Sequence, residues 1–510
     1  MARPEIDNKS NTIKDVEQLG IWSGLASLSY VFWICGGMEM VERFAYYGVR
    51  NNAALYATAP VSEGGLGITA TQLGDIFFVW ALVQTWVPVI TGGLSDRFGY
   101  KETIFAATLF KIAGYVAMAM FASYWGFMTG AILVAFGTAI FKPGLQGTIV
   151  KSTNRRNSSI AWGVFYQTVN IGGYFGTLIA IQMRQLSWDT MFYVNAAMIM
   201  VNLLLLLVYK EPDKEERLAR RAKIKSGELV EPSLWKEAIA EFKRPILIYY
   251  VVLFSGFWFM LYSFFDVLPL HIRDWIDTST IVTTLFGPDG TQNPVAHFMM
   301  GLTDDGLSIN PAGLFNLNSF IIMLTCFFVA GLSARMKAVN SMAVGTFLLS
   351  AGLIMVGGLS AAWLLVSAIA VFSVGEMLAS PKSSEYLGNI APADKKAMYL
   401  GFSQAPIGIG WTLEGKLGPS WYDQWASKET FSRQLLAENG LDQDSIAGIP
   451  NGEAFSYLVE STAQTPAQVT ELLYQSHNIG QLWYVMAAIG VVSAFGLYVY
   501  GRWTYRVATS

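Results

Sequence analysis

The sequence has little charge, little cysteine and little histidine, and each shortage excludes a class of protein. Only 14% of its 510 residues are Asp, Glu, Lys or Arg, whereas soluble domains carry about 25%. So few charges cannot coat a water-exposed surface of this size, which excludes a soluble enzyme, a fibre and a disordered scaffold. The formal net charge of −3 leaves no basic surface for nucleic acid.

Cysteine and histidine exclude most metal chemistry. Cys35 and Cys326 each lie inside an apolar run, so neither a disulfide framework nor a Cys-based zinc site is indicated. His271, His297 and His477 lie in or beside polar segments, which leaves no histidine for a metal or a proton relay inside the membrane. No nucleophile–base pair stands out. We therefore expect no metal, no enzyme activity and no cofactor.

Long hydrophobic runs are what the sequence has in abundance. About 20 apolar residues in a helix cross the hydrocarbon core of a bilayer. Scanning on that basis predicts an all-α membrane protein with twelve transmembrane helices in two six-helix pseudo-repeats. The spans are expected near 22–47, 70–93, 103–122, 125–149, 159–181, 190–209, 245–270, 314–334, 341–359, 361–380, 398–418 and 480–501. The first and seventh exceed the bilayer thickness, so we expect them to tilt or protrude.

The distribution of Lys and Arg predicts the orientation. These residues concentrate in the segments that lie inside if both termini are cytoplasmic. We expect an integral, multi-pass protein of the cell (inner or plasma) membrane, present as a monomer. The predicted domains are a cytoplasmic segment 1–21, a six-helix bundle 22–209, a charged cytoplasmic linker 210–244, a second bundle 245–502 with long extracytoplasmic loops 271–313 and 419–479, and a cytoplasmic tail 503–510.

An internal repeat supports the division into two halves. Three pairs of short motifs match at one common offset, each at the equivalent span. The pairs are GLSDR at 93–97 with GLSAR at 331–335, Pro143 with Pro381, and Ile171-Gly172 with Ile409-Gly410. Two parallel halves are typical of a rocking transporter whose site lies between them, near mid-membrane.

The first span carries the strongest polar cluster, which we call the polar stripe. Its members step by three and four residues and so share one helical face. They are Glu39, Glu42, Arg43, Tyr46, Tyr47 and Arg50. Charges at membrane depth face a cavity or one another and mark ion or substrate paths. A structural ion-pair network is the alternative interpretation.

Further polar residues interrupt later spans. Lys142 needs a carboxylate to keep its charge, and Glu39 or Glu42 is the expected partner; Pro143 beside it would open the backbone. Glu376, one turn before Pro381, is the clear carboxylate of the second half. Other residues are weaker candidates: Asp266 and Glu414 fit a membrane interface, Asn170 and Asn318 fit helix–helix hydrogen bonding, and Lys111 fits a structural role. The loop at 92–101 presents Asp96 and Arg97, which could latch a gate.

At these residues the chain resembles the major facilitator superfamily, through GLSDRFGYK at 93–101. Within it, the chain resembles the proton-dependent oligopeptide transporter family. The first-span signature of that family appears as Glu39-Met-Val-Glu42-Arg43-Phe44, followed by Tyr46, Tyr47, Gly48 and Arg50. Further matches are Phe141-Lys142-Pro143, Phe165-Tyr166 with Asn170-Ile171-Gly172, and Gly375-Glu376-Met377 with Ser380-Pro381.

The resemblance implies import of di- and tripeptides driven by inward proton movement. It gives proton coupling to Glu39, Glu42, Arg43 and Lys142. It gives the peptide carboxylate to Arg50 and Lys142, the peptide ammonium to Glu376 and Asn318, and the pocket lining to Tyr46, Tyr47 and Asn170. Asp96, Arg97, Pro143 and Pro381 would serve gating. The expected partners are small peptides, protons and the lipid bilayer.

Three departures mark an atypical member. Tyr262 stands where the family carries a seventh-span Glu that pairs with Arg50 during gating. No Trp occurs early in the predicted eleventh span, MYLGFSQAPIG, and segment 210–244 leaves no room for two extra helices. Two alternatives therefore stay open. One is the same fold carrying another carboxylated solute, a modified peptide or an anion. The other is a non-transporting receptor that uses loop 419–479.

Overall fold

The computed structural model consists almost entirely of helices. It describes residues 21–91, 98–154, 156–212, 214–226, 228, 239–333, 336–358, 360–392 and 396–507. Four predicted features lie wholly or partly outside these residues. They are the N-terminal segment 1–21, the loop residues Asp96 and Arg97, the linker 210–244 and the tail 503–510.

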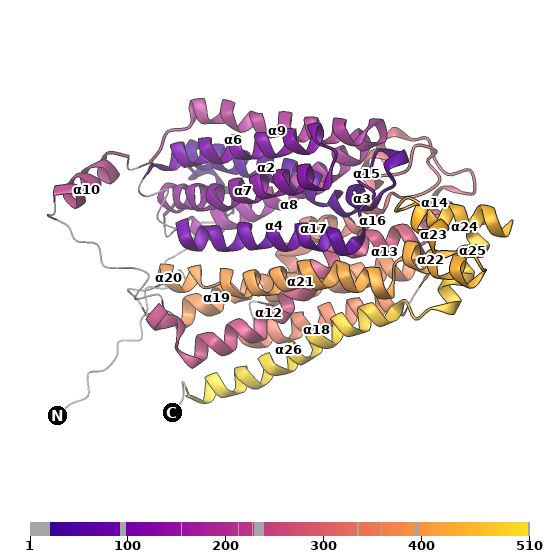
Figure 1. Ribbon diagram of the computed structural model, residues 1–510. Helices are drawn as coiled ribbons and strands as arrows, with labels where there is room; N and C mark the ends of the chain where they lie inside the picture. The colour runs from indigo at the N-terminus through magenta and orange to yellow at the C-terminus, as the bar shows by residue number, and fades with distance from the viewer. Residues whose placement is uncertain are drawn as a thin grey trace.

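Within the described ranges, twelve helices have 17 or more residues and run side by side in one bundle (Figure 1). Those of the N-terminal half are α2 (Tyr30–Arg50), α4 (Ala70–Thr91), α6 (Tyr100–Met120), α7 (Tyr124–Ser152), α8 (Ser158–Leu186) and α9 (Trp188–Val208). Those of the C-terminal half are α12 (Pro245–Asp266), α17 (Leu317–Ser333), α18 (Ala338–Gly357), α19 (Ala362–Ile390), α21 (Gln404–Trp425) and α26 (Gly480–Val507). The all-helical fold class is confirmed.

Eight helical segments of the described chain are long and apolar enough to cross a membrane, judged by length and composition. The other four long helices are α2, α4, α8 and α21. These four contact the opposite half: α4 packs against α21, α8 packs against α17, and Arg50 of α2 pairs with Asp266 of α12. We call the interface between the two halves the seam. A helix that faces the seam can carry polar residues there, so it does not need an apolar surface all round.

The two spans predicted to be too long are each broken into two helices. Residues 27–29 separate α1 (Ile21–Ala26) from α2, and the Ser29 hydroxyl accepts a hydrogen bond from the backbone N–H of Phe32 as an N-cap. At the other break α12 ends at Asp266, and α13 (Leu268–Trp275) begins with Pro269 in its first turn. Proline has no N–H to continue a preceding helix, so it favours a fresh start there. The extra length of the two predicted spans therefore belongs to a separate short helix at each place.

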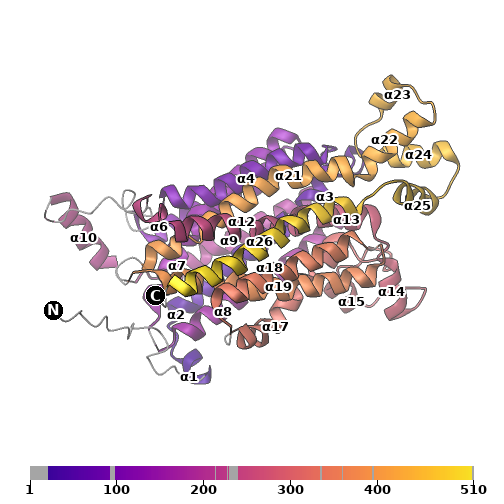
Figure 2. The ribbon, with the colours of Figure 1, turned by 90° about the horizontal axis from the view of Figure 1, so that it is seen from below.

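The short helices gather at the two ends of the bundle (Figures 1 and 2). We call one end the lid end; it carries α3 (Ala53–Thr58), α13, α14 (Ser279–Phe286), α15 (Pro294–Met300), α16 (Pro311–Phe315), α22 (Lys428–Glu438), α23 (Gln443–Gly448), α24 (Ala454–Thr462) and α25 (Pro466–Ser476). We call the opposite end the linker end; it carries α10 (Lys214–Ser226) and α20 (Lys396–Gly401).

The two halves repeat one close helix contact. Gly172 of α8 lies against the backbone of α2 at Met40, where an added Cβ would collide with the carbonyl oxygen. Gly410 of α21 lies in the same way against the backbone of α12 at Ser255. Small residues let helix backbones approach closely in membranes. The matched Ile-Gly pairs of the sequence therefore fix the fifth helix of each half on the first.

Buried apolar side chains show where the halves are joined. The larger cluster runs through both halves and includes Tyr46, Phe77 and Trp80 from the N-terminal half. A second, smaller cluster belongs to the N-terminal half alone and includes Phe32, Phe141 and Phe165. The N-terminal half therefore shares a continuous core with its partner over part of its length and keeps a separate core over the rest.

Candidate functional site

The polar stripe of α2 is buried along its length, apart from the half-buried Tyr47. Arg43 lies at its centre. Its Nε is 3.1 Å from an Oε of Glu39, its Nη2 contacts Glu42, and its guanidinium lies over the rings of Tyr46 and Tyr47 at 4.9 and 5.7 Å from their centroids. Both carboxylates are thus held by one cation. The sequence placed these residues on one face correctly.

Lys111 of α6, for which the sequence indicated a structural role without naming a partner, is the second cation of this cluster. Its Nζ pairs with Glu42, and neither side chain has any exposed surface. Lys142 of α7, the partner expected for Glu39 or Glu42, forms no ion pair with any described residue. It interacts with both carboxylates at longer range and is half-buried. Glu42 therefore pairs with Lys111 and not with Lys142.

Glu376 of α19 faces the seam from the other half and is also half-buried. An Oε accepts a hydrogen bond from the side-chain amide of Asn318 at 3.1 Å, and that amide also donates to the hydroxyl of Ser373 at 3.0 Å. The structure therefore brings Asn318 and Glu376 together, as their shared predicted role requires. In the part of the chain that the structure describes, Glu376 has no ion-pair partner.

Aromatic and amide side chains of the N-terminal half lie between these charges. Tyr47 interacts electrostatically with both Arg43 and Glu376. Tyr166 of α8 lies near Glu376 and Tyr47, and the side-chain amide of Asn170 donates to the Tyr166 carbonyl at 2.9 Å. Tyr46 points elsewhere, because its hydroxyl donates to Gln84 of α4 at 3.1 Å. Tyr47 therefore interacts with charged groups of both halves, and the pocket-lining role of Tyr47 and Asn170 stays a prediction.

Arg50, at the end of the polar stripe, joins the two halves. Its Nη2 contacts Asp266 of α12, and both side chains are buried. Asp266 lies one turn after Tyr262, so it supplies the carboxylate that the sequence analysis found missing at Tyr262. The periodicity of the helix was the available signal, since residues i and i+4 share a face. Arg50 is thus engaged by a carboxylate in this state.

Tyr262 instead packs against α21. Its ring stacks on Trp411 with 4.2 Å between centroids and an angle of 5°. The guanidinium of Arg50 lies 5.7 Å from the Trp411 ring. Because α21 begins at Gln404, six residues later than the predicted span, Trp411 lies within two turns of the helix start. The early Trp judged absent from this helix is therefore Trp411, and the error came from the misplaced boundary.

Glu414 of α21 is a second buried carboxyl beside the same pair. It interacts with Asp266 and with Arg50, and it has no exposed surface. Within the described residues, neither of its oxygens receives a hydrogen bond from a donor group. The sequence left Glu414 and Asp266 as weaker candidates that could lie at a membrane interface. Both are buried between helices in the interior of the protein.

Polar contacts between the halves gather at the lid end. Arg184 of α8 donates to Asn310 at 2.7 Å, and Arg273 of α13 donates to Thr58 at 2.6 Å. Lys416 of α21 pairs with Asp75 of α4. With the pair of Arg50 and Asp266, these contacts hold the lid end closed.

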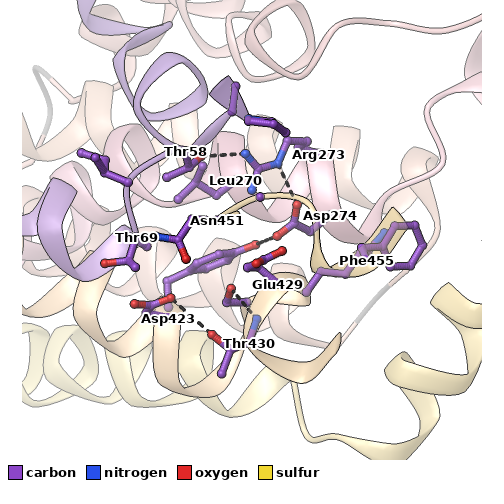
Figure 3. Close-up of a pocket in the computed structure, with 18 of the residues that line it drawn as sticks. Thr58, Thr69, Leu270, Arg273, Asp274, Asp423, Glu429, Thr430, Asn451 and Phe455 are labelled. Carbon is purple, nitrogen blue, oxygen red and sulfur yellow. Dashed lines mark hydrogen bonds and ion pairs between the residues drawn. The ribbon is translucent and has the colours of Figure 1, made fainter. Parts of the chain in front are cut away.

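A cavity of about 510 Å³ lies within these contacts (Figure 3). Its walls come from both halves, with Thr58 and Thr69 facing Arg273, Asp274 and Asp423. Its charges mostly neutralise one another, since Arg273 is 2.7 Å from Asp274 and Arg433 is 2.8 Å from Glu429.

The pKa values of groups at the lid end reflect burial and pairing. Burial alone would raise the pKa of Asp274, but the Arg273 guanidinium outweighs it and holds that pKa below the usual range. Burial lowers the pKa of the Lys428 ammonium, against the attraction of Asp274. Burial also lowers the pKa of His271 to about 4. His271 is therefore neutral at pH 7, and its Nδ1 accepts a hydrogen bond from Trp483 at 3.2 Å.

The residues predicted to serve gating have mixed placements. Pro143 and Pro381 lie inside α7 and α19, the matching helices of the two halves, each 29 residues long. Both helices continue through the proline. Asp96 and Arg97 lie outside the described residues.

Comparison with known proteins decides the family. The family model described as Major Facilitator Superfamily matches residues 32–413, which is most of the chain. The chain belongs to the Major Facilitator Superfamily. Members of this superfamily are transporters and not enzymes, and the chain is accordingly an integral, multi-pass membrane protein.

Curated relatives within the superfamily match different lengths of the chain. The transporter YclF of Bacillus subtilis (strain 168) is 31% identical over 179 residues, which are 34% of this chain and 35% of YclF. The peptide transporter YePEPT of Yersinia enterocolitica is 26% identical over 175 residues, 33% of this chain and 34% of YePEPT. The chain therefore spans about a third of the length of these two relatives. The multidrug resistance protein MdtH of Edwardsiella ictaluri is 20% identical over 71% of this chain and 80% of MdtH.

Solved structures share the fold over nearly the whole chain. A peptide transporter POT crystallised with sulfate has a TM-score of 0.64 and 16% identity, covering 94% of this chain and 98% of its own. A POT family transporter in complex with 5-aminolevulinic acid has a TM-score of 0.64 and 15% identity, covering 96% of this chain and 99% of its own. These likenesses agree with the family resemblance seen in the sequence.

Proposed function

We propose that this superfamily member is a proton-coupled symporter of di- and tripeptides that works by alternating access. The observation that carries the proposal is a pair of half-buried, opposite charges on the two halves. Lys142 lies on the N-terminal half, and Glu376 lies on the C-terminal half. Neither forms an ion pair with another described residue, so each can meet a charged end of a substrate.

The charge balance of the N-terminal cluster supports a substrate with a carboxylate. Glu39 and Glu42 bring two negative charges, whereas Arg43, Lys111 and Lys142 bring three positive ones. One positive charge is left over, and Lys142 is its most accessible carrier. Glu376 leaves one negative charge over on the opposite side. A free peptide at neutral pH is a zwitterion and complements both.

The remaining predicted residues have the following roles in this proposal. Asn318 orients Glu376 toward the peptide ammonium, and Tyr47 and Asn170 offer hydrogen bonds to the peptide backbone. Tyr46 supports the stripe through Gln84. Arg50 contacts the peptide carboxylate only in states in which Asp266 has released it.

Proton coupling would use the buried carboxylates of the polar stripe. A proton on Glu39 or Glu42 frees Arg43 from one of its partners, and this alters the charge that faces Lys142. Asp96, Arg97, Pro143 and Pro381 would control the linker end. In the cell the carrier would act as a monomer in the cell membrane, with both termini cytoplasmic and the proton as its coupling ion.

The deciding experiment is uptake of labelled dialanine into proteoliposomes under an inward proton gradient and membrane potential. Wild type is compared with Glu42→Gln and with Glu438→Gln, an exposed control on α22. We expect gradient-driven uptake in wild type and in the control, and counterflow exchange without gradient-driven uptake in Glu42→Gln. Absence of gradient-driven peptide uptake by wild type would reject the proposal.

A second candidate substrate class shares the same chemistry. The structural neighbour in complex with 5-aminolevulinic acid holds a solute with one ammonium and one carboxylate. The separated charges of Lys142 and Glu376 suit such amino acids as well as peptides. Competition of 5-aminolevulinic acid with dialanine uptake separates the classes, because only a shared site allows each solute to inhibit the other.

A further inference from the structure

Glu414 lies beside the ion pair of Arg50 and Asp266, and its charge has no counter-charge of its own. Asp266 and Glu414 are both buried without exposed surface, and among the described residues Arg50 is the one cation that interacts with them. Two ionised carboxylates and one guanidinium would leave a net negative charge in the interior. A buried, unpaired charge of this kind is costly, so such groups bind a proton instead.

Hydrogen bonding points to the same deficit. One oxygen of Asp266 contacts Arg50, and the Trp411 indole also interacts with Asp266, whereas both oxygens of Glu414 have no donor among the described residues. The two carboxyl groups lie next to each other. Ionised carboxylates are acceptors only, so neither can donate to the other. One added proton creates the missing donor.

Among the described residues, the other ionisable side chains beside this cluster are tyrosines, and the neighbouring α13 carries His271, Arg273 and Asp274, which form contacts of their own. Arg50 and Tyr46 come from α2, Tyr262 and Asp266 come from α12, and Glu414 comes from α21. Facing Arg50, α4 presents the rings of Phe77 and Trp80; its Asp75 pairs with Lys416 near the surface. Also packed on α12 and α21 are α18, which carries no titratable residue, and α26, whose tyrosines lie near its ends beside Gly357 and Tyr386.

We propose that Glu414 is a proton-binding residue, and that Asp266 and Glu414 share one proton beside Arg50 while the lid end is closed. The shared proton leaves one negative charge on the two carboxyls, which balances the guanidinium. Gly418, one turn after Glu414, leaves the space, since a Cβ there would collide with an Oε of Glu414. This proton site rests on the proposed function for its role in transport, though not for its existence.

Under the proposed function, a second proton would change the charge of this cluster during the transport cycle. A second proton, arriving from solvent at the lid end, would neutralise both carboxyls and remove the counter-charge of Arg50. The contact between α2 and α12 would then weaken and the lid end could open. Loss of that proton at the other face restores the single negative charge, and the pair with Arg50 forms again.

The test is the infrared carbonyl band of protonated carboxyl groups in the purified, lipid-reconstituted protein at pH 7. Difference spectra compare wild type with Glu414→Gln, Asp266→Asn, Glu414→Asp and the exposed control Glu438→Gln. We expect the same band to be lost in Glu414→Gln and in Asp266→Asn, because either change leaves one carboxylate matched to Arg50. The band should persist in Glu414→Asp and in Glu438→Gln.

Difference spectra that show no lost carboxyl band for either Glu414→Gln or Asp266→Asn would overturn the proposal. The conservative Glu414→Asp variant guards against a misfolded protein, because it keeps a carboxyl beside Asp266. The infrared readout does not require transport. A protein that shows the band but does not carry dialanine would reject the proposed function alone, and a peptide carrier without the band would reject the shared proton alone.

Discussion

Lys111 of α6 and Glu42 of α2 form an ion pair from which water is fully excluded. Arg43 holds the other oxygen of the same carboxylate. Glu42 is therefore held from two helices, whereas Lys142 stands half-buried and free of such a partner among the described residues. The two lysines of this cluster therefore differ in role. Lys111 belongs to the buried interior, and Lys142 faces the seam.

Replacing these two lysines should have unequal effects on stability. Removing one partner of a buried ion pair costs about 3–5 kcal/mol, because the other charge stays behind. Lys111→Met should lose about this much unfolding free energy, while Lys142→Met should lose less than about 1 kcal/mol. Denaturant titration in detergent micelles, followed by tryptophan fluorescence, measures both. Equal losses would contradict the assignment of Lys111 as the buried partner.

In the cluster of Arg50, Asp266 and Glu414, loss of the cation should lower the unfolding free energy more than loss of one carboxylate. Arg50→Met strands two carboxyls in the interior and should cost about 3–5 kcal/mol. Asp266→Asn leaves Glu414 as a counter-ion for Arg50, so a smaller loss of about 1–3 kcal/mol is expected. Asp75→Asn, at the exposed pair with Lys416, serves as the control with a loss of at most about 1 kcal/mol. If Asp266→Asn proved as damaging as Arg50→Met, Glu414 would not be acting as a substitute.

Glu376→Gln should weaken substrate binding without slowing the cycle of the loaded carrier. A hydrogen bond to a charged group contributes about 1.5–3 kcal/mol, so the KM for dialanine should rise roughly 10- to 100-fold with little change in the maximal rate. N-acetylated dialanine lacks the ammonium, so it should bind more weakly than dialanine to wild type. In Glu376→Gln the two peptides should bind with similar affinity. Competition assays in proteoliposomes measure both effects. Unchanged discrimination between the two peptides would remove Glu376 from the ammonium site.

His271 should make the lid end sensitive to acid. Its pKa is about 4 in the folded protein because of burial, against about 6.5 in an unfolded chain. The unfolded state therefore binds the proton first, and stability present above pH 6.5 is lost as the pH falls toward 4, by up to about 3 kcal/mol. His271→Asn keeps an acceptor for Trp483 and removes the titration. Melting temperatures of wild type should fall more steeply than those of the variant between pH 6.5 and 4, and parallel curves would speak against this.

Close helix contact at the seam should be needed to close the lid end. A Cβ on Gly415 of α21 would lie 2.9 Å from the backbone of Phe77 on α4. Gly415→Leu should hold the halves apart, whereas Gly388→Leu meets open space within 4 Å and serves as the control. Oxidative cross-linking of Asp75→Cys with Lys416→Cys, in a Cys326→Ser background, reports closure. We expect at least a tenfold lower yield with Gly415→Leu; equal yields would show that the contact is not required.

Helical periodicity predicted which residues share a face of one helix, but not which neighbouring helix that face meets. The polar stripe of α2 was found for this reason, whereas Asn318 was grouped with Glu376 only through the family resemblance. Lys111 and Lys142 could not be ranked in the same way, because the choice depends on how α6 and α7 rotate against α2. Only packing decides that rotation.

Helix boundaries account for the other errors. With the eleventh span placed six residues early, Trp411 seemed too deep to match the expected Trp, and Glu414 seemed close to an interface. Asp266 does end α12, as its place near the outer end of the predicted span indicated, but α13 follows directly after Val267. In each case a short polar or proline-containing break, rather than the apolar run itself, determined where the side chain lies.

The short helices after α21 are bonded to the opposite half at the lid end. Glu453, just before α24, accepts a hydrogen bond from Ser62 at 2.7 Å, and Gly452 lies against Pro60. This junction belongs to the C-terminal half by sequence and must part from the N-terminal half whenever the lid end opens. An antibody fragment that binds both sides of it at once would arrest the carrier in a single state. Such a fragment would inhibit the carrier by binding this exposed junction outside the bilayer, and it would not need to enter the substrate site.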